Sequence, residues 1–160
     1  MDVVANASFR EVQYMRRWIW LVALTCLVVI ISAGMSGMNK PGMIASMRIP
    51  VFVAGLSTVL FLVSKLIVEV RDDGIYIKYS PFHMSYRKIP LSEIASVEAR
   101  TYSPLREYGG WGFRGFGKNM AYNVSGNRGV QLVLRDGKRL LIGSQKPEEL
   151  ADAILLAKGR

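Results

Sequence analysis

Three glycines between residues 110 and 115 have the spacing G-x-G-x-x-G, which can mark a turn that holds a phosphate group. In a dinucleotide site this spacing follows a strand, begins a helix and is followed about 20 positions later by an acidic residue. Here the sequence after Gly115 has the alternation of a strand, and the next acidic residue, Asp136, precedes a glycine in a turn. Asn119 also stands where a Walker loop needs Ser or Thr. The spacing therefore does not favour a nucleotide site.

Aromatic and basic side chains alternate in the same glycine-rich segment. Residues 100–128 contain five basic side chains and one acidic side chain, Glu107. Aromatic rings beside cations are typical of contact with a membrane surface, and a protein contact is a second interpretation. In a third interpretation the segment is structural, with Trp111 and one phenylalanine closing the mouth of a barrel. The candidate contact residues for lipid or a partner are Arg106, Trp111, Phe113, Arg114, Phe116 and Lys118.

Few residues could support catalysis or hold a metal. The only histidine, His83, lies in a short turn-like segment where no pattern identifies a nucleophile and its base. Asp72 and Asp73 precede a glycine, and a tight turn explains both. One histidine and one cysteine, Cys26, cannot supply the four ligands of a closed zinc site. We therefore expect a protein that is not an enzyme and has no catalytic residue, metal site or cofactor.

The first part of the chain is apolar enough to predict two membrane spans. The 160 residues are 51% hydrophobic, and their mean hydropathy is +0.22. Residues 18–38 contain no charged side chain and would reach about 32 Å as a helix. A second apolar run, 49–68, is interrupted only by Lys65, whose ammonium group can reach the interface. We expect these two spans to form a two-helix transmembrane hairpin.

The distribution of basic residues predicts the orientation of this hairpin. The connector between the two spans holds only Lys40 and Arg48. More basic residues flank the outer ends: Arg10, Arg16, Arg17, Lys65, Arg71 and Lys78. The positive-inside rule then places both termini in the cytoplasm and the protein in the inner (plasma) membrane. The net charge of +9 fits such a surface, and nucleic-acid binding is the weaker interpretation.

After residue 68 the apolar pattern changes from continuous to alternating, which is typical of strands with one buried face. The turn signals Asp73-Gly74 and Asp136-Gly137 predict hairpins. About seven short strands are expected, at 68–70, 75–79, 84–89, 94–102, 120–124, 129–135 and 138–142. The segment 147–158 begins with proline and two glutamates and ends with lysine, which predicts a helix.

Four segments of this region carry a family resemblance. They are Ile89-Pro-Leu-Ser-Glu-Ile-Ala-Ser-Val-Glu98, Tyr102-Ser-Pro-Leu-Arg-Glu-Tyr-Gly-Gly-Trp-Gly112, Asn123-Val-Ser-Gly-Asn-Arg-Gly-Val130 and Ile142-Gly-Ser-Gln-Lys-Pro-Glu-Glu-Leu150. Through them the region from about Val68 to Lys158 resembles the pleckstrin-homology-like (PH-like) domains of uncharacterised, membrane-anchored prokaryotic proteins. The resemblance implies an α+β fold, in which a two-helix transmembrane hairpin precedes a seven-stranded antiparallel β-barrel or sandwich capped by a C-terminal helix. It implies no catalytic residues.

Together these patterns predict two domains and a class of function. Residues 1–68 would form the N-terminal segment with the transmembrane hairpin, and residues 69–160 a cytoplasmic PH-like domain. We expect a non-enzymatic binding or adaptor module on the cytoplasmic face that recruits a protein or senses anionic lipid. The alternative is a small subunit of a membrane complex that packs through its hairpin, where Gly34 and Gly55 permit close helix contact.

Overall fold

The computed structural model describes residues 7–14, 23–24, 26–31, 34, 43–81 and 83–159. The chain divides into two compact units. One unit combines Met1–Tyr14 with Lys65–Arg160, and the other is Met15–Ser64. The N-terminal residues thus belong to the same unit as the C-terminal half.

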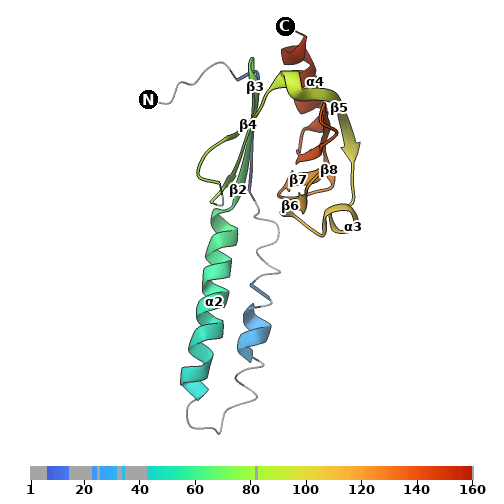
Figure 1. Cartoon of the computed structure of the whole chain (residues 1–160). Helices are drawn as coiled ribbons and strands as arrows, with labels where there is room; N and C mark the ends of the chain where they lie inside the picture. Colours follow the sequence, from blue (N-terminus) through green and yellow to red (C-terminus); the bar gives the residue numbers. More distant parts are fainter. Residues whose placement is uncertain are drawn as a thin grey trace. The chain divides into compact units, whose positions relative to one another are not determined.

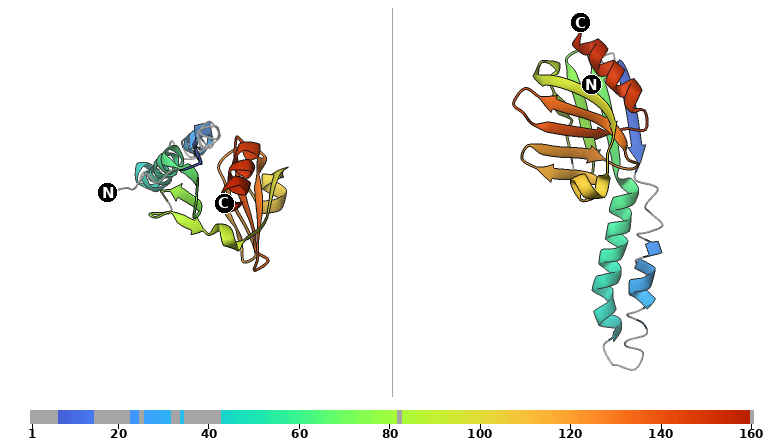
Figure 2. Two further views of the ribbon diagram at one scale, coloured as in Figure 1. Left: turned by 90° about the horizontal axis from the view of Figure 1, so that it is seen from above. Right: turned by 90° about the vertical axis from the view of Figure 1, so that its right-hand side faces the viewer.

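Within the described residues, the first unit contains two β-sheets (Figures 1 and 2). The first sheet has the order β1 (Phe9–Tyr14), β2 (Lys65–Arg71), β3 (Gly74–Ser80) and β4 (Arg87–Ile89), with antiparallel neighbours. The second has the order β5 (Ile94–Thr101), β8 (Arg128–Leu134), β9 (Arg139–Gly143), β7 (Asn119–Asn123) and β6 (Gly112–Phe116). In the second sheet β7 and β9 are parallel, and the other neighbours are antiparallel.

The core forms from one apolar face of each sheet. In the first sheet Leu66 is opposite Tyr79 and Val68 is opposite Ile77, so these buried side chains share a face. In the second sheet two further buried pairs, Val130 with Ile142 and Leu132 with Leu140, do the same. Each such side chain contributes about 1.5–3 kcal/mol when it is fully buried. Strand alternation therefore explains why these residues form sheets rather than helices.

Helix α4 (Pro147–Lys158) packs against strands of both sheets. Its first turn carries Glu148 and Glu149 and its last turn carries Lys158, an arrangement that suits the helix dipole. Leu150 and Ile154 lie on one helical face and are fully buried. The helix is thus anchored along one side to both sheets.

Edge strand β1 is tied to the end of β9 by two polar side chains. The Glu11 carboxylate accepts hydrogen bonds from Ser144 Oγ (2.5 Å) and from the backbone N–H of Gln145 (2.8 Å). The buried amide of Gln13 donates to the carbonyl oxygen of Gly143 (2.8 Å). These contacts link residues more than 100 positions apart in sequence. They fix β1 against the segment that leads into α4.

The remaining elements are short connections and one longer helix. A 3-10 turn, η2 (Leu91–Glu93), joins β4 to β5, and α3 (Pro104–Tyr108) follows β5. The second unit contains α2 (Met43–Val63) and the helical residues 23–24, 26–31 and 34. In this unit Cys26 Sγ lies 3.8 Å from Thr58 Oγ1.

The structure corrects the predicted transmembrane hairpin. Among the residues described, no helix has both the length and the apolar character needed to cross a membrane. The second predicted span, 49–68, is divided, because α2 ends at Val63 and β2 begins at Lys65. A continuous apolar run does not by itself distinguish a helix from a buried strand. Most of the first predicted span, 18–38, lies outside the described residues.

The same finding overturns the predictions that depended on the hairpin. These are the two-pass membrane topology, the location in the inner membrane and the cytoplasmic position of both termini. The alternative role, a small subunit of a membrane complex, stays a prediction. Within the described residues, a Cβ added at Gly34 or Gly55 would meet nothing within 4 Å.

The predicted seven-stranded antiparallel barrel is also wrong. Among the described residues the strands form two separate sheets of four and five strands, not a closed barrel. Two strands were not predicted: β1, which precedes the predicted spans, and β6, whose glycines suggest a loop. The parallel pairing of β7 with β9 was not predicted either. The predicted helix 147–158 and the hairpin at Asp136-Gly137 are confirmed.

Replacing Glu11 by alanine should lower the free energy of unfolding of the full chain by about 1–2 kcal/mol, because Ser144 and the Gln145 amide lose their acceptor. Urea denaturation followed by circular dichroism measures the change. Glu98→Ala on exposed β5 is the matched control and should shift stability by less than about 0.5 kcal/mol. Equal effects of the two substitutions would contradict the anchoring role of Glu11.

Candidate functional site

The glycine-rich segment forms a β-hairpin between β6 and β7. Gly112 pairs with Asn123, and Phe116 pairs with Asn119 across a turn that contains Gly117. Gly115 has φ +90°, and a Cβ at this position would lie 2.1 Å from the carbonyl oxygen of Asn119. The spacing G-x-G-x-x-G thus serves the close approach of two strands. No helix begins here, so the segment has no phosphate-binding helix N-terminus.

Trp111 anchors the start of this hairpin. Its indole Nε1 donates a hydrogen bond to the carbonyl oxygen of Gly126 (3.0 Å). The next residue, Gly112, donates its backbone N–H to the buried side chain of Asn123 (2.8 Å). Trp111, a predicted contact residue, is therefore held through its polar atom within the protein.

The backbone of Trp111 orients the side chain of Arg114. Its Nε donates to the carbonyl oxygen of Trp111 (3.0 Å), and its terminal nitrogens make no other hydrogen bond or ion pair within the described residues. Strand register places Arg114 beside Ala121 and Leu141 on one face of the second sheet. Arg139, two residues before Leu141 on β9, lies on that same face. The guanidinium group of Arg114 is therefore positioned by the backbone with two nitrogens available to a ligand.

Further basic side chains lie on α3, in the hairpin turn and on β9. Arg106 on α3 and Lys118 in the hairpin turn are exposed, and neither forms an ion pair within the described part of the chain. Burial raises the pKa of the Tyr108 phenol, and the positive charges of Arg100 first and of Arg139 last oppose this shift. We define the cationic surface as Arg114, Lys118 and Arg139.

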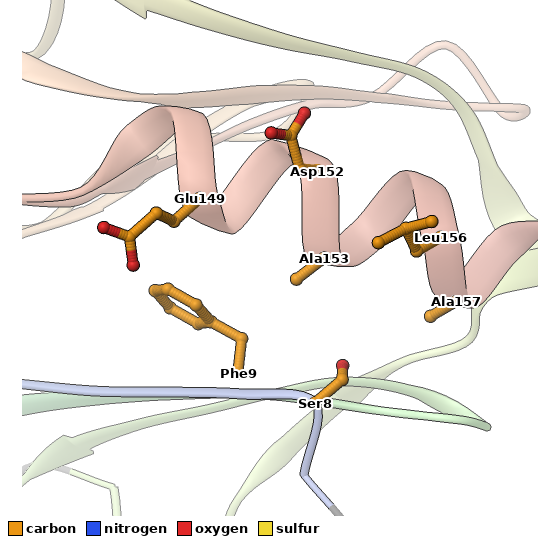
Figure 3. Close-up of a pocket in the computed structure, with 7 residues that line it drawn as sticks. All are labelled: Ser8, Phe9, Glu149, Asp152, Ala153, Leu156 and Ala157. Atoms are coloured by element: carbon orange, nitrogen blue, oxygen red, sulfur yellow. The ribbon is translucent and has the colours of Figure 1, made fainter.

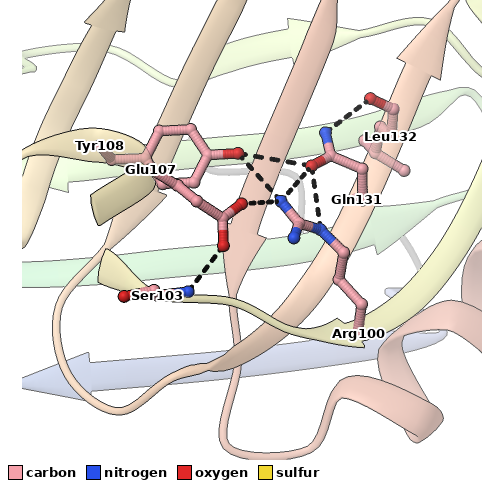
Figure 4. A network of polar contacts seen from close by, with 6 residues as sticks. All are labelled: Arg100, Ser103, Glu107, Tyr108, Gln131 and Leu132. Carbon is pink, nitrogen blue, oxygen red and sulfur yellow. Dashed lines mark hydrogen bonds and ion pairs between the residues drawn. The ribbon is translucent and has the colours of Figure 1, made fainter. Parts of the chain in front are cut away.

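A polar network holds α3 against the sheet next to the cationic surface (Figure 4). The Arg100 guanidinium contacts Glu107 Oε2 (2.7 Å) and Gln131 Oε1 (3.0 Å), and it also contacts the Tyr108 hydroxyl (3.3 Å). Glu107 Oε1 accepts the backbone N–H of Ser103 (2.7 Å). Arg100 first, and then the Ser103 amide, lower the pKa of the Glu107 carboxyl. The single acidic residue of this region is thus already neutralised by Arg100.

Phe113 lies on the opposite face of the hairpin from Arg114. Its ring is 43% exposed and packs on Tyr122, with ring centres 4.8 Å apart, and on His83, at 5.4 Å. The His83 Nδ1 atom is buried and has no hydrogen-bond partner within the described residues. Burial, and secondly the nearby charge of Arg87, lower the pKa of His83. This aromatic cluster connects the β3–β4 connection with the second sheet.

The structure therefore separates the predicted contact residues. Arg114, Arg106 and Lys118 present cations, whereas Trp111 is tied down and Phe113 faces the other side. Phe116 ends β6, and its side chain lies outside the described part of the protein. Sequence reasoning missed Arg139. Its alternation with Leu141 in the predicted strand 138–142 places both on one strand face, but only the parallel pairing of β7 with β9 brings that face into line with Arg114.

A groove between β1 and α4 is a second feature of the same unit (Figure 3). Its volume is about 350 Å³. It is lined by Ser8, Phe9, Glu149, Asp152, Ala153, Leu156 and Ala157. Among the described residues, no group of three or more His, Cys, Asp or Glu side chains could hold a metal ion there or elsewhere.

A family model for DUF6141, described as a family of unknown function, matches residues 1–159. The chain belongs to this family. A search among curated proteins found no match. The DUF6141 description names no activity, so the function has to be argued from the geometry of the two surfaces described above.

Replacing Gly115 by alanine should destabilise the hairpin, because the new Cβ would collide with the Asn119 carbonyl oxygen at a positive φ angle. We expect a loss of about 2–4 kcal/mol in the free energy of unfolding. Gly117→Ala is the matched control, since Gly117 also has positive φ but a Cβ there meets nothing within 4 Å. Its cost should be about 1 kcal/mol. Equal costs in urea denaturation would contradict the close strand contact.

Stability should decrease as the pH falls from about 7 to about 5.5. The pKa of His83 is lowered in the folded state, so the unfolded chain takes up a proton at higher pH than the folded chain does. The stabilising contribution is complete above the ordinary histidine pKa and is lost as the pH drops through this interval. His83 is the only histidine, so His83→Gln should remove this pH dependence. Urea denaturation of both proteins across the interval tests this, and an unchanged slope in the variant would contradict it.

Proposed function

We propose that the protein is a non-enzymatic binding module that recruits an acidic segment of a protein partner at the cationic surface. The orientation of Arg114 carries the proposal. The Nε group of Arg114 donates a hydrogen bond to the Trp111 carbonyl oxygen, which fixes the plane of the guanidinium group. The two terminal nitrogens of Arg114 have no hydrogen-bond partner within the described residues. A planar guanidinium fixed in this way matches a carboxylate, which can accept two parallel hydrogen bonds.

The charge around Arg114 supports an acidic ligand. Lys118 in the adjacent turn and Arg139 on the same sheet face add positive charge, and Glu107 is already paired with Arg100. The whole chain carries a net charge of +9, which increases the rate of encounter with acidic partners. Such a surface gains specificity from the fixed orientation of the planar Arg114 guanidinium group and not from charge alone.

The geometry favours a protein segment over a lipid surface. A membrane-contacting loop presents its aromatic rings and cations on the same side. Here Phe113 and Arg114 lie on opposite faces of β6, and the Trp111 indole N–H is bonded to Gly126. The cations therefore project from the face of the hairpin that does not carry the Phe113 ring. A surface of this kind suits an extended acidic segment better than a membrane.

A binding role also fits the chemistry of the surrounding side chains. His83, the one histidine of the sequence, packs on the rings of Phe113 and Tyr122. The cationic surface supplies hydrogen-bond donors and positive charge. These groups bind an anion and do not form an acid–base pair in the described residues.

Replacing Arg114 by glutamine should weaken binding of a fluorescein-labelled hexaglutamate peptide about tenfold, measured by fluorescence anisotropy with the full chain. Arg114→Lys keeps the charge but loses the fork, so its affinity should be intermediate. Arg135→Gln, which removes an exposed arginine from the β8–β9 turn, is the control and should change affinity less than about twofold.

Two results would contradict the proposal. One is an equal loss for Arg114→Gln and Arg135→Gln, which would mean that only net charge matters. The other is salt-sensitive binding to vesicles of anionic phospholipid without binding to the peptide, which would assign the surface to lipid.

A further inference from the structure

The groove between β1 and α4 combines an apolar floor with an acidic rim (Figure 3). Phe9 forms the wall on the strand side, and Ala153 and Ala157 lie one helical turn apart on α4. Both helix residues are alanines, and their short side chains do not fill the groove. Its volume of about 350 Å³ falls near the lower end of the range for ligand pockets, about 300–1,000 Å³.

Two exposed leucines extend this apolar floor along the helix. Leu155 is 50% exposed and Leu156 is 69% exposed, although Leu150 and Ile154 of the same helix are fully buried. Leu156 lines the groove, and Leu155 lies beside it with Asp152. Contiguous exposed apolar side chains of this kind are typical of interaction sites.

The rim of the groove is negative in a strongly basic protein. Glu149 is partly neutralised by Lys146, whose Nζ lies 2.9 Å from its carboxylate. Asp152 forms no ion pair or hydrogen bond within the described residues. Figure 3 shows the Glu149 carboxylate beside the Phe9 ring and the Asp152 carboxylate at the outer rim, on the side of the helix away from the strand. In a chain of net charge +9, this local negative charge complements a cationic ligand side chain.

Strand β1 supplies an edge along which a ligand can lie. It pairs with β2 on one side and is the terminal strand of its sheet. The Glu11 and Gln13 hydrogen bonds to the β9–α4 connection hold it in place. A wall that is already ordered lowers the entropic cost of binding an extended segment.

We propose that this groove is a second interaction surface, which binds an extended segment of a protein partner with an apolar side chain next to a lysine or arginine. The apolar side chain contacts Phe9, Ala153 and Leu156, and the cation pairs with Asp152. This inference does not rest on the cationic surface, because the two surfaces select opposite ligand charges. A protein with both surfaces can join two partners of different chemistry.

The probe is a fluorescein-labelled peptide in which leucine and lysine alternate, titrated by anisotropy against the full chain. Asp152→Lys should weaken binding at least about tenfold, since it replaces attraction by repulsion. Leu156→Ser should weaken binding several-fold, and because Leu156 is exposed the substitution should leave the fold intact. Glu98→Lys on exposed β5 makes the same charge change outside the groove and should leave affinity within about twofold.

Exchanging the two charges tests whether the peptide cation pairs with Asp152 itself or responds only to the overall charge of the protein. A peptide with glutamate in place of lysine should bind Asp152→Lys better than the wild-type chain. Arg114→Gln should leave binding of the lysine peptide unchanged, so failure of one surface is distinguishable from failure of the other. Circular dichroism checks that every variant is folded.

Three results would overturn the inference. The first is equal binding of a peptide in which glycine replaces leucine, because the apolar floor would then have no role. The second is an equal loss of affinity for Asp152→Lys and Glu98→Lys. The third is dimerisation of the free chain, measured by light scattering, that Leu156→Ser abolishes, because the groove would then be covered by a second copy.

Discussion

The attachment of β1 to the β9–α4 connection is the contact on which the rest of the first unit depends. Glu11 and Gln13 bring the beginning of the chain against Gly143, Ser144 and Gln145. This attachment adds long-range side-chain contacts to the backbone pairing of β1 with β2, and β1 in turn forms the wall of the groove opposite α4. The buried Nε2 group of Gln13 favours this contact, because an unpaired buried donor is costly, whereas the Oε1 atom has no hydrogen-bond partner within the described residues. A local pairing of polar groups thus determines which distant segments meet.

The cationic surface depends on a different constraint, the close approach of β6 and β7. Gly115 permits this approach. Trp111 is bonded to Gly126 through its indole, and its carbonyl oxygen accepts the hydrogen bond that orients Arg114. The neighbouring network of Arg100 and Gln131 pairs the Glu107 and Tyr108 side chains of α3 within the protein (Figure 4). As a result the region contains two kinds of arginine. Arg100 stabilises the fold, whereas Arg114 retains the capacity to bind a ligand.

Sequence patterns predicted the local elements of the C-terminal region better than their assembly. The helix 147–158 and the hairpin at Asp136-Gly137 were predictable because capping residues and turn glycines act over a few positions. The strand at Phe9–Tyr14 was not, because its alternation spans only six residues and its stabilising partners lie far away in sequence. The run 49–68 was misassigned because a helix and the beginning of a buried strand follow one another with almost no polar interruption.

The candidate site was predictable to a similar extent. Composition identified Arg106, Arg114 and Lys118 as a basic group, but it could not show that Trp111 bonds inward or that Phe113 and Arg114 lie on opposite faces. Those properties follow from the register Phe113–Tyr122 and Arg114–Ala121, which requires knowing where β6 begins. Arg139 joins the group only through the parallel pairing of β7 with β9. The groove involves β1 and α4, which meet only in the folded chain.

The pairing of Tyr14 with Lys65 has a topological consequence. These two residues are the points at which the chain leaves the first unit and returns to it, and neighbouring strands are separated by about 4.8 Å. The fifty residues between them are therefore an insertion into what would otherwise be an ordinary β-hairpin. Insertions at such adjacent ends are compatible with an intact host fold, because the host needs only a short link to close.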